Sequence, residues 1–268
     1  MLEAGESNEA AVHLERAVAL LANKPDAADA HYLLAKIETS KGEVNRTVGH
    51  LERAVALRPD FAEAWADLGM ARRLVGDSSG ALSALKRSVE LNPDDAIAQY
   101  RLGAEYLRQN RLEEALQHLQ TASKLSPDDQ STLNAVANAL RQSGRVAEAD
   151  AMKKRLAEVI RRRDRASQDQ LKALRLNNEG AALEKKGDLP GALQHYQEAH
   201  TLYPDHSGIQ INYAVALLRS GKWTEGLSEL HRALERDPGN EKLRRAWQDA
   251  VAQAPEWARN IALPSTPK

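Results

Sequence analysis

The sequence predicts an all-α fold of repeated helical hairpins, and three observations support this prediction. Helix-forming residues such as Ala, Leu, Glu and Arg dominate the 268 residues, whereas residues that favour strands are scarce, with one Phe and six Tyr. Prolines recur at a fixed interval, and glycines recur at the same interval near the middle of each unit. The stretches between these markers carry apolar residues at the spacing of one helix face.

The prolines mark the boundaries between repeats. A proline inside a helix costs about 3 kcal/mol, so recurring prolines are expected between helices. Their interval of 34 residues holds in two series, Pro25, Pro59, Pro93 and Pro127, then Pro204 and Pro238.

A second marker divides each repeat into two helices. Glycine, and next asparagine, are the residues that adopt the left-handed backbone conformation with which helices end. At one of these positions Asn110 replaces glycine, which favours a turn with positive φ. The markers are Gly42, Gly76, Asn110 and Gly144, then Gly187 and Gly221.

The unit from Ala62 to Pro93, AEAWADLGMARRLVGDSSGALSALKRSVELNP, resembles the tetratricopeptide repeat, W-x-x-L-G-x-x-Y…A…F…A…P, at the correct spacing, although Arg72 stands where the pattern has Tyr. The resemblance covers about residues 1–240 and points to a bacterial member of the family. It implies a right-handed superhelical solenoid of helix-turn-helix repeats, whose first helices line a concave groove that binds peptides or partner helices.

Glycines also occur in the middle of first helices, where each is about 1 kcal/mol less favourable than alanine. A closely approaching second helix would compensate for this cost. The glycines are Gly69, Gly103 and Gly180, and the small residues expected to face them are Ala81, Ala115 and Ala192.

The chain is expected to begin within a repeat. The string LERAVAL occurs at residues 14–20 and 51–57, and this alignment places the first turn at Gly5. Residues 1–27 would then be a partial first repeat that retains only its second helix. Because that helix would lack a partner, we expect further repeats or a signal sequence upstream.

Complete repeats are expected over residues 28–165, two further repeats over 166–240, a capping helix over 241–254 and a tail over 255–268. The last repeat of the first group has an elongated second helix, since the marker glycines on either side of it are 43 residues apart, nine more than a repeat. Ser167 and Gln170 form an S-x-x-Q capping box that predicts a new helix start there.

No catalytic motif or phosphate-binding loop is present, so we expect neither enzymatic activity nor a cofactor. The absence of cysteine excludes disulfides and thiolate metal sites. Four of the eight histidines share one position of the second helix, which indicates a repeat preference and no metal site. These are His13, His50, His118 and His195.

The resemblance implies a partner-binding groove on the first helices, for a protein or peptide and not for a small-molecule substrate. Amide, guanidinium, aromatic and thioether side chains there are suited to hold a peptide. Alternatively, its arginines satisfy the ends of their helices. The candidate residues are Tyr32, Lys36, Met70, Arg73, Tyr100, Arg101, Leu107, Arg108, Asn134, Asn138 and Arg141.

Two other functions stay open. The chain would be the repeat portion of a larger enzyme, such as a protein-modifying transferase, if a catalytic domain lies outside it. The basic run in residues 153–165 would bind nucleic acid or an acidic partner, although the net charge of −1 and the lack of nearby aromatic residues favour a solvated helix face.

Asn178 and Asn212 share one groove position, but Ala181 and Ala246 stand where the carboxylate clamp of some relatives needs polar residues. No apolar run approaches the roughly 18 residues that span a bilayer, and the compartment stays undetermined.

Overall fold

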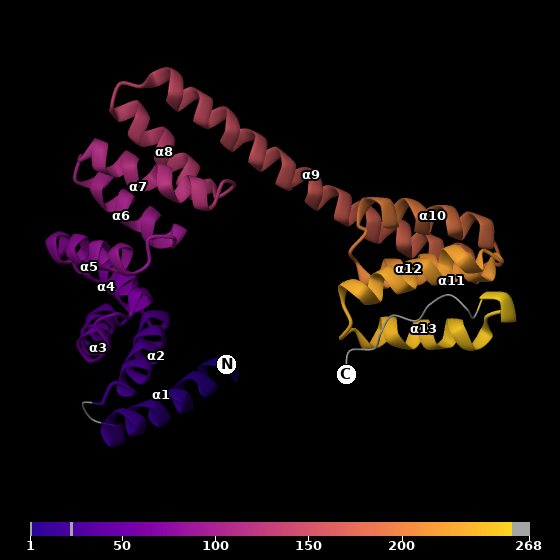
Figure 1. Ribbon diagram of the computed structural model, residues 1–268, viewed down its shortest axis with the longest axis horizontal. Helices are drawn as coiled ribbons and strands as arrows, with labels where there is room; N and C mark the ends of the chain where they lie inside the picture. Colours follow the sequence, from indigo (N-terminus) through magenta and orange to yellow (C-terminus); the bar gives the residue numbers. More distant parts are fainter. Residues whose placement is uncertain (1, 22–23, 259–268) are drawn as a thin grey trace. The chain divides into compact units, whose positions relative to one another are not determined.

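The computed structural model describes residues 2–21 and 24–258, with side chains from Glu9 onward, and these residues form thirteen α-helices and one 3-10 helix but no strand (Figure 1). The all-α prediction is therefore confirmed. The helices are α1 (Leu2–Leu21), α2 (Ala27–Ser40), α3 (Val44–Leu57), α4 (Ala62–Leu74), α5 (Ser78–Leu91), α6 (Ala96–Arg108), α7 (Leu112–Leu125), α8 (Gln130–Gln142), α9 (Val146–Lys185), α10 (Leu189–Leu202), α11 (Ser207–Arg219), α12 (Trp223–Arg236), α13 (Glu241–Gln253) and η1 (Glu256–Ala258).

The helices alternate between two roles. We call the first helix of each hairpin the A helix (α2, α4, α6, α8, α11 and α13) and the second the B helix (α1, α3, α5, α7, α10 and α12). Each A helix from α2 to α6, and α11, packs against the B helix that follows it, and successive A helices α4, α6 and α8 also touch. Helix α9 begins as the B partner of α8 and ends as the A partner of α10.

The turns inside the hairpins have the backbone that the sequence predicts. The five marker glycines have φ between +75° and +86°, and Asn110 has φ +58°. In the turn at Gly76, the amide of Asp77 donates to the carbonyl of Arg72 at 2.9 Å, which satisfies a carbonyl at the end of α4. The positive φ at all six positions is confirmed.

The mid-helix glycines lie where a B helix approaches closely, as predicted. A Cβ atom at Gly69 would lie 2.5 Å from Leu85 Cγ and 3.1 Å from the carbonyl oxygen of Ala81. Gly103 faces Leu119 in the same way, and Gly180 faces Tyr196. Glycine is needed here because any side chain would push the two helices apart.

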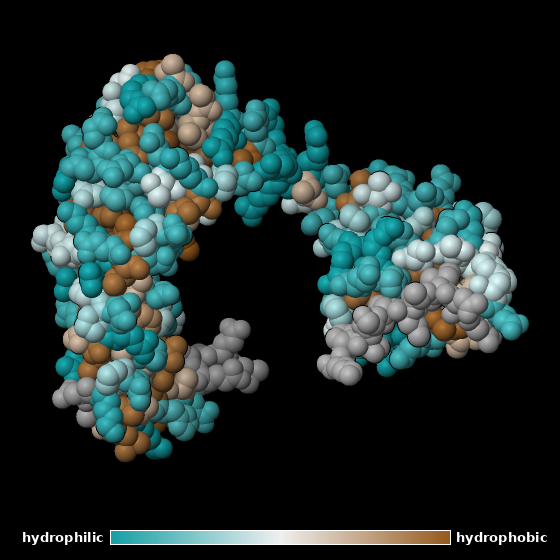
Figure 2. Space-filling model, in the orientation of Figure 1, coloured by the Kyte–Doolittle hydropathy of each residue, from teal (hydrophilic) through white to brown (hydrophobic). Residues whose placement is uncertain are grey.

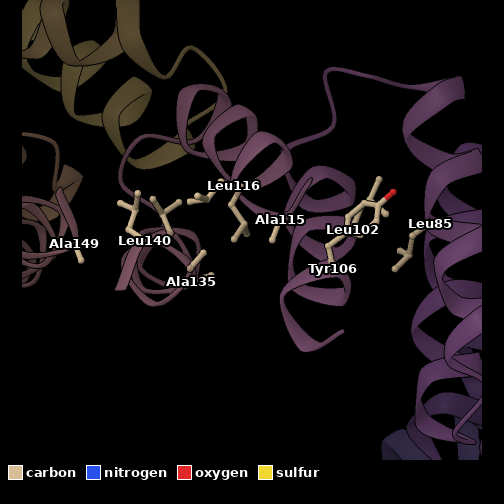
Figure 3. Packing of buried hydrophobic residues seen from close by; sticks show 11 residues of the cluster. Leu85, Leu102, Tyr106, Ala115, Leu116, Ala135, Leu140 and Ala149 are labelled. Atoms are coloured by element: carbon tan, nitrogen blue, oxygen red, sulfur yellow. The ribbon is translucent and has the colours of Figure 1, made fainter. Parts of the chain in front are cut away.

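Leucine and alanine side chains fill the space between successive hairpins. Figure 3 shows one such cluster as a row that runs from Leu85 on α5 through Leu102 and Ala115 to Ala149 on α9. Because each hairpin buries its apolar face against the next, the core is continuous along the stack.

The predicted turn at Gly5 is wrong. Helix α1 is one continuous helix of 20 residues, Leu2–Leu21, that runs through Gly5. A glycine ends a helix only when the chain must turn there, and inside a helix it merely costs about 1 kcal/mol.

The helix start predicted at Ser167 is also wrong. Helix α9 continues without a break for 40 residues, from Val146 to Lys185. Its residues 161–168 are all exposed, and they contain neither proline nor glycine to break the helix. Figure 2 shows mainly hydrophilic residues over this stretch. No helix among the described residues is both long enough and apolar enough to cross a bilayer.

The chain divides into two compact units, residues 1–160 (unit 1) and 161–268 (unit 2). Unit 1 ends on charged residues at positions that are apolar in its other repeats. Lys153 of α9 is exposed, whereas its equivalents Leu51, Leu85 and Leu119 are at most 1 % exposed. Asp150, equivalent to the buried Leu116, is likewise exposed and pairs with Arg141 at 2.8 Å.

Unit 2 begins in the same way. Arg175 is exposed at the position occupied by the fully buried Ala98 and Ile209. Glu179 is exposed at the position of the buried Leu102, and its carboxylate lies 3.7 Å from Arg175 Nε. Charged side chains therefore replace the apolar contact surface at the end of one stack and at the start of the other.

Candidate functional site

Side chains from three successive A helices of unit 1 converge on one carboxylate, that of Asp67 on α4. The hydroxyl of Tyr32 on α2 donates to Asp67 Oδ2 at 3.1 Å, and Lys36 Nζ lies 3.3 Å from the same oxygen. Arg101 on α6 donates from Nη1 to Asp67 Oδ1 at 2.8 Å. We call these four residues the Asp67 cluster.

The electrostatics of the Asp67 cluster fix its hydrogen-bonding roles. Burial, followed by the charge and hydrogen bond of Asp67, raises the pKa of Tyr32 to about 12, so the hydroxyl stays a donor at neutral pH. The cluster holds two cations against one anion and carries a net charge of about +1. Lys36 keeps 58 % of its side chain exposed, which leaves its ammonium group open to a further anionic ligand.

A pocket of about 410 Å³ lies beside the Asp67 cluster, between α2 and α4. Met70, Ala71 and Leu74 supply apolar lining on the α4 side, and Thr39 and Val44 face them from the preceding hairpin. The site thus places a charged cluster next to a hollow of mixed polarity.

The other predicted groove residues differ in how far their side chains are already engaged within the protein. Tyr100 and Leu107 pack partly against the core cluster of α5–α9. Arg108 is bound to the buried carboxylate of Glu105 through hydrogen bonds of 2.5 and 2.6 Å. Arg73 is half-buried in the last turn of α4.

On α8 the predicted residues Asn134 and Asn138 are exposed, and Arg141 donates to Asp150 at 2.8 Å. Asn134 and Arg141 occupy the positions of the partly buried Tyr100 and Leu107 of α6. Polar residues are suited to these positions because α8 is the last A helix of unit 1.

Sequence reasoning missed Asp67, although it sits at the centre of the cluster. Its equivalents in the neighbouring repeats are Leu33 and Arg101, so repeat alignment gives no sign of a conserved acidic position. The available signal was the alternation of sign, since an acid on α4 faces a base one repeat later on α6.

Sequence reasoning also missed a larger pocket of about 990 Å³ in unit 2, between α11 and α13. Most of its lining residues occupy repeat positions that also line the unit 1 pocket, but two charged positions of the unit 1 pocket are apolar here. Val215 replaces Lys36, and Ala246 replaces Asp67. The lining residues are Ile211, Val215, Leu218, Arg219, Gly221, Trp223, Glu241, Lys242, Arg245, Ala246, Asp249, Ala250 and Gln253.

The histidines take part in packing between paired helices. His31 Nδ1 lies 3.2 Å from His50 Nδ1, and Gln99 Oε1 lies 2.8 Å from His118 Nδ1 at the equivalent position. Within the described residues, no group of three or more His, Asp or Glu side chains could hold a metal ion.

The basic run lies on α9. Arg155 donates to the carbonyl of Pro127 at 2.7 Å, which ties one of its cations to unit 1. The other members are exposed, namely Lys153, Lys154, Arg161, Arg162, Arg163 and Arg165. In unit 2, Asn212 donates to Asn177 at 2.9 Å.

Comparisons with known proteins agree on the architecture. Two family models described as tetratricopeptide repeat match the chain, one over residues 48–96, 75–130 and 100–159 and the other over residues 183–254. A comparison with curated proteins finds no match.

Similar solved structures include three of MamA. "MamA 41-end from Desulfovibrio magneticus RS-1" has a TM-score of 0.55 and 23 % identity, covering 61 % of this chain and 90 % of that one. "Crystal structure of MamA" has a TM-score of 0.56 and 22 % identity, covering 60 % and 93 %. "MamA MSR-1 C2" has a TM-score of 0.50 and 28 % identity, covering 60 % and 90 %. These likenesses concern the fold.

Proposed function

Because the chain belongs to the tetratricopeptide repeat family, we propose that it is a non-catalytic scaffold that binds a segment of another protein on the A helices of unit 1. The observation that supports this proposal is the Asp67 cluster, in which polar side chains of α2, α4 and α6 meet at one carboxylate. A ligand that contacts all three helices would bridge three repeats.

The chemistry of the cluster favours a segment with a carboxylate next to an apolar side chain. Within the Asp67 cluster, Lys36 and Arg101 supply two cations, and Asp67 supplies the anion that pairs with both. The pocket beside them would accept an apolar side chain against Met70 and Leu74. Charge-assisted hydrogen bonds to the carboxylate would fix the register of the segment.

A selection from a random peptide library displayed on phage tests this proposal. Peptides selected on the wild-type chain are synthesised, and their affinity is measured by fluorescence anisotropy. We expect acidic peptides, and we expect Arg101→Ala to weaken their binding about tenfold, the effect of losing one charge-assisted hydrogen bond.

Arg87→Ala is the matched control, because Arg87 is an exposed arginine on the B helix α5, where it pairs with Glu90 at 3.2 Å. This variant should bind the selected peptides like the wild type. Selected peptides that bind both variants equally well would show that the Asp67 cluster is not the binding site.

A further inference from the structure

The pocket in unit 2 has features that the Asp67 cluster does not explain. Its floor is apolar and partly accessible, with Ile211, Val215 and Trp223 half-buried. Its volume of about 990 Å³ is more than twice that of the equivalent pocket in unit 1. An apolar hollow of this size is suited to several side chains of a partner.

The rim of this pocket carries an ordered row of charges on α13. Glu241, Arg245 and Asp249 follow one another at intervals of four residues, so they lie on one face about 6 Å apart. All three are exposed and line the pocket. Within the part of the chain that the structure describes, none of them forms an ion pair.

We infer that this pocket binds an amphipathic helix of another protein, whose apolar stripe is flanked by a row of positive, negative and positive residues at four-residue intervals. That row complements Glu241, Arg245 and Asp249 in sign and in spacing. Because the rim pattern is symmetric, a helix running in either direction along α13 would match it.

The geometry favours a helix over an extended segment. In a strand, residues that share a face lie two apart, and the residues between them point to the opposite side. A strand that directed its charges at α13 would therefore turn its intervening apolar residues away from the pocket. A helix presents a charge row and an apolar stripe on adjacent faces, as the floor and rim of the pocket require.

The inference goes beyond the proposed function, because it places a second and chemically different site in the other unit. Either site can fail its test while the other passes. The comparison of equivalent positions also supplies a test, since Lys36 of unit 1 shows which residue would remove the apolar character of the unit 2 pocket at Val215.

The experiment uses the full chain and two synthetic 21-residue peptides with the same leucine stripe. One peptide carries the row Lys-Glu-Lys beside the stripe and the other carries Glu-Lys-Glu, with the charges balanced on the far face. Fluorescence anisotropy at low salt should show about tenfold tighter binding of the first, since each of three exposed ion pairs contributes modestly. Equal affinity for the two peptides would overturn the inference.

Three variants complete the test. Val215→Lys, which introduces the residue found at this position in unit 1, should remove the preference for the Lys-Glu-Lys peptide, whereas Val146→Lys, at an exposed valine of α9 that lines neither pocket, should keep it. The triple variant Glu241→Lys, Arg245→Glu and Asp249→Lys should prefer the Glu-Lys-Glu peptide. A preference that survives Val215→Lys, or that is lost in Val146→Lys, would place the peptide elsewhere.

Sedimentation measurements test the other candidate for this pocket, which is a second copy of this chain. A wild-type chain that stays monomeric at the concentrations of the binding assay supports a foreign helix. A dimer that Val215→Lys dissociates would assign the pocket to self-association and overturn the inference.

Discussion

At the scale of single residues, the glycines inside helices have opposite roles that depend on their neighbours. A Cβ atom at Gly103 would lie 2.7 Å from Leu119 Cγ and 3.0 Å from the backbone nitrogen of Leu119. Nothing lies within 4 Å of a Cβ atom at Gly49, in the middle of α3. We therefore expect Gly103→Ala to lower the free energy of unfolding by about 1–3 kcal/mol and Gly49→Ala to raise it by up to about 1 kcal/mol.

Urea denaturation of the two variants measures this difference directly. Both substitutions add one methyl group to a helix, so intrinsic helix propensity favours both. A stabilised Gly103→Ala variant would show that α6 and α7 do not approach as closely as the structure indicates.

The close approach between paired helices was predictable from sequence only where glycine marks the A helix. In the α11–α12 hairpin the two residues are exchanged, with Ala214 on the A helix and Gly226 on the B helix. A Cβ atom at Gly226 would lie 2.8 Å from the carbonyl oxygen of Ala214, so the contact is kept. A search for glycine at one fixed position misses this hairpin, because packing requires a small residue from either helix.

Protonation of buried histidines is expected to destabilise the fold. Burial, followed by the charges of His50 and Arg53, lowers the pKa of His31 from its ordinary 6.5. The unfolded chain then binds more protons than the folded chain between the lowered pKa and 6.5, so stability is lost as the pH falls through that window. We expect the melting temperature of the wild type to decrease as the pH is lowered from about 7.5 to about 5.5.

His31→Gln should reduce that dependence, because glutamine stands at the equivalent position of α6, where Gln99 bonds to His118. Thermal denaturation of both proteins across the same pH range provides the measurement. Identical slopes for the two proteins would exclude His31 as a contributor.

At the scale of elements, the ends of most helices follow from proline and from residues with positive φ, but α9 does not end where its sequence suggests. A capping box satisfies the first amides of a helix only if the backbone turns before it. With neither proline nor glycine in residues 161–168, continuing the helix retains every backbone hydrogen bond. Local sequence therefore allows both outcomes, and only the continuous structure distinguishes them.

Alanine substitution separates a true cap from a residue inside a helix. Asp129 precedes α8 and accepts a hydrogen bond from the amide of Thr132 at 2.7 Å, so Asp129→Ala should cost about 1 kcal/mol. Ser167 lies inside α9, so Ser167→Ala should instead raise stability by a few tenths of a kcal/mol. If urea denaturation showed that both variants are destabilised by similar amounts, a helix would start at Ser167, as the capping box predicted.

At the scale of the whole molecule, the charged ends of the two stacks predict opposite effects for reciprocal substitutions. Leu119 is fully buried, so Leu119→Lys should lower the free energy of unfolding by about 3 kcal/mol or more. Lys153 is exposed at the equivalent position of the next repeat, so Lys153→Leu should change it by no more than about 0.5 kcal/mol. A large effect of Lys153→Leu on urea denaturation would mean that this face is covered.

The repeat pattern predicted the fold more fully than it predicted the candidate site. Residues such as Leu119 are constrained by packing wherever another hairpin follows in the stack, so their positions follow from the interval of 34 residues. Groove residues are free to vary between repeats, and their partners are set by neighbours on other helices. Tyr32, Lys36 and Arg101 were therefore predicted singly, whereas their meeting at Asp67 required the structure.

The charged residues at the stack ends have a further consequence for the protein at high concentration. A solenoid whose last hairpin exposed leucine would offer each molecule a template for the first hairpin of another, and such head-to-tail contacts polymerise without limit. Asp150 and Lys153 at one end, and Arg175 and Glu179 at the other, would have to shed their hydration for that growth to begin. The same four side chains that interrupt the repeat pattern thus oppose the assembly of filaments at these two faces.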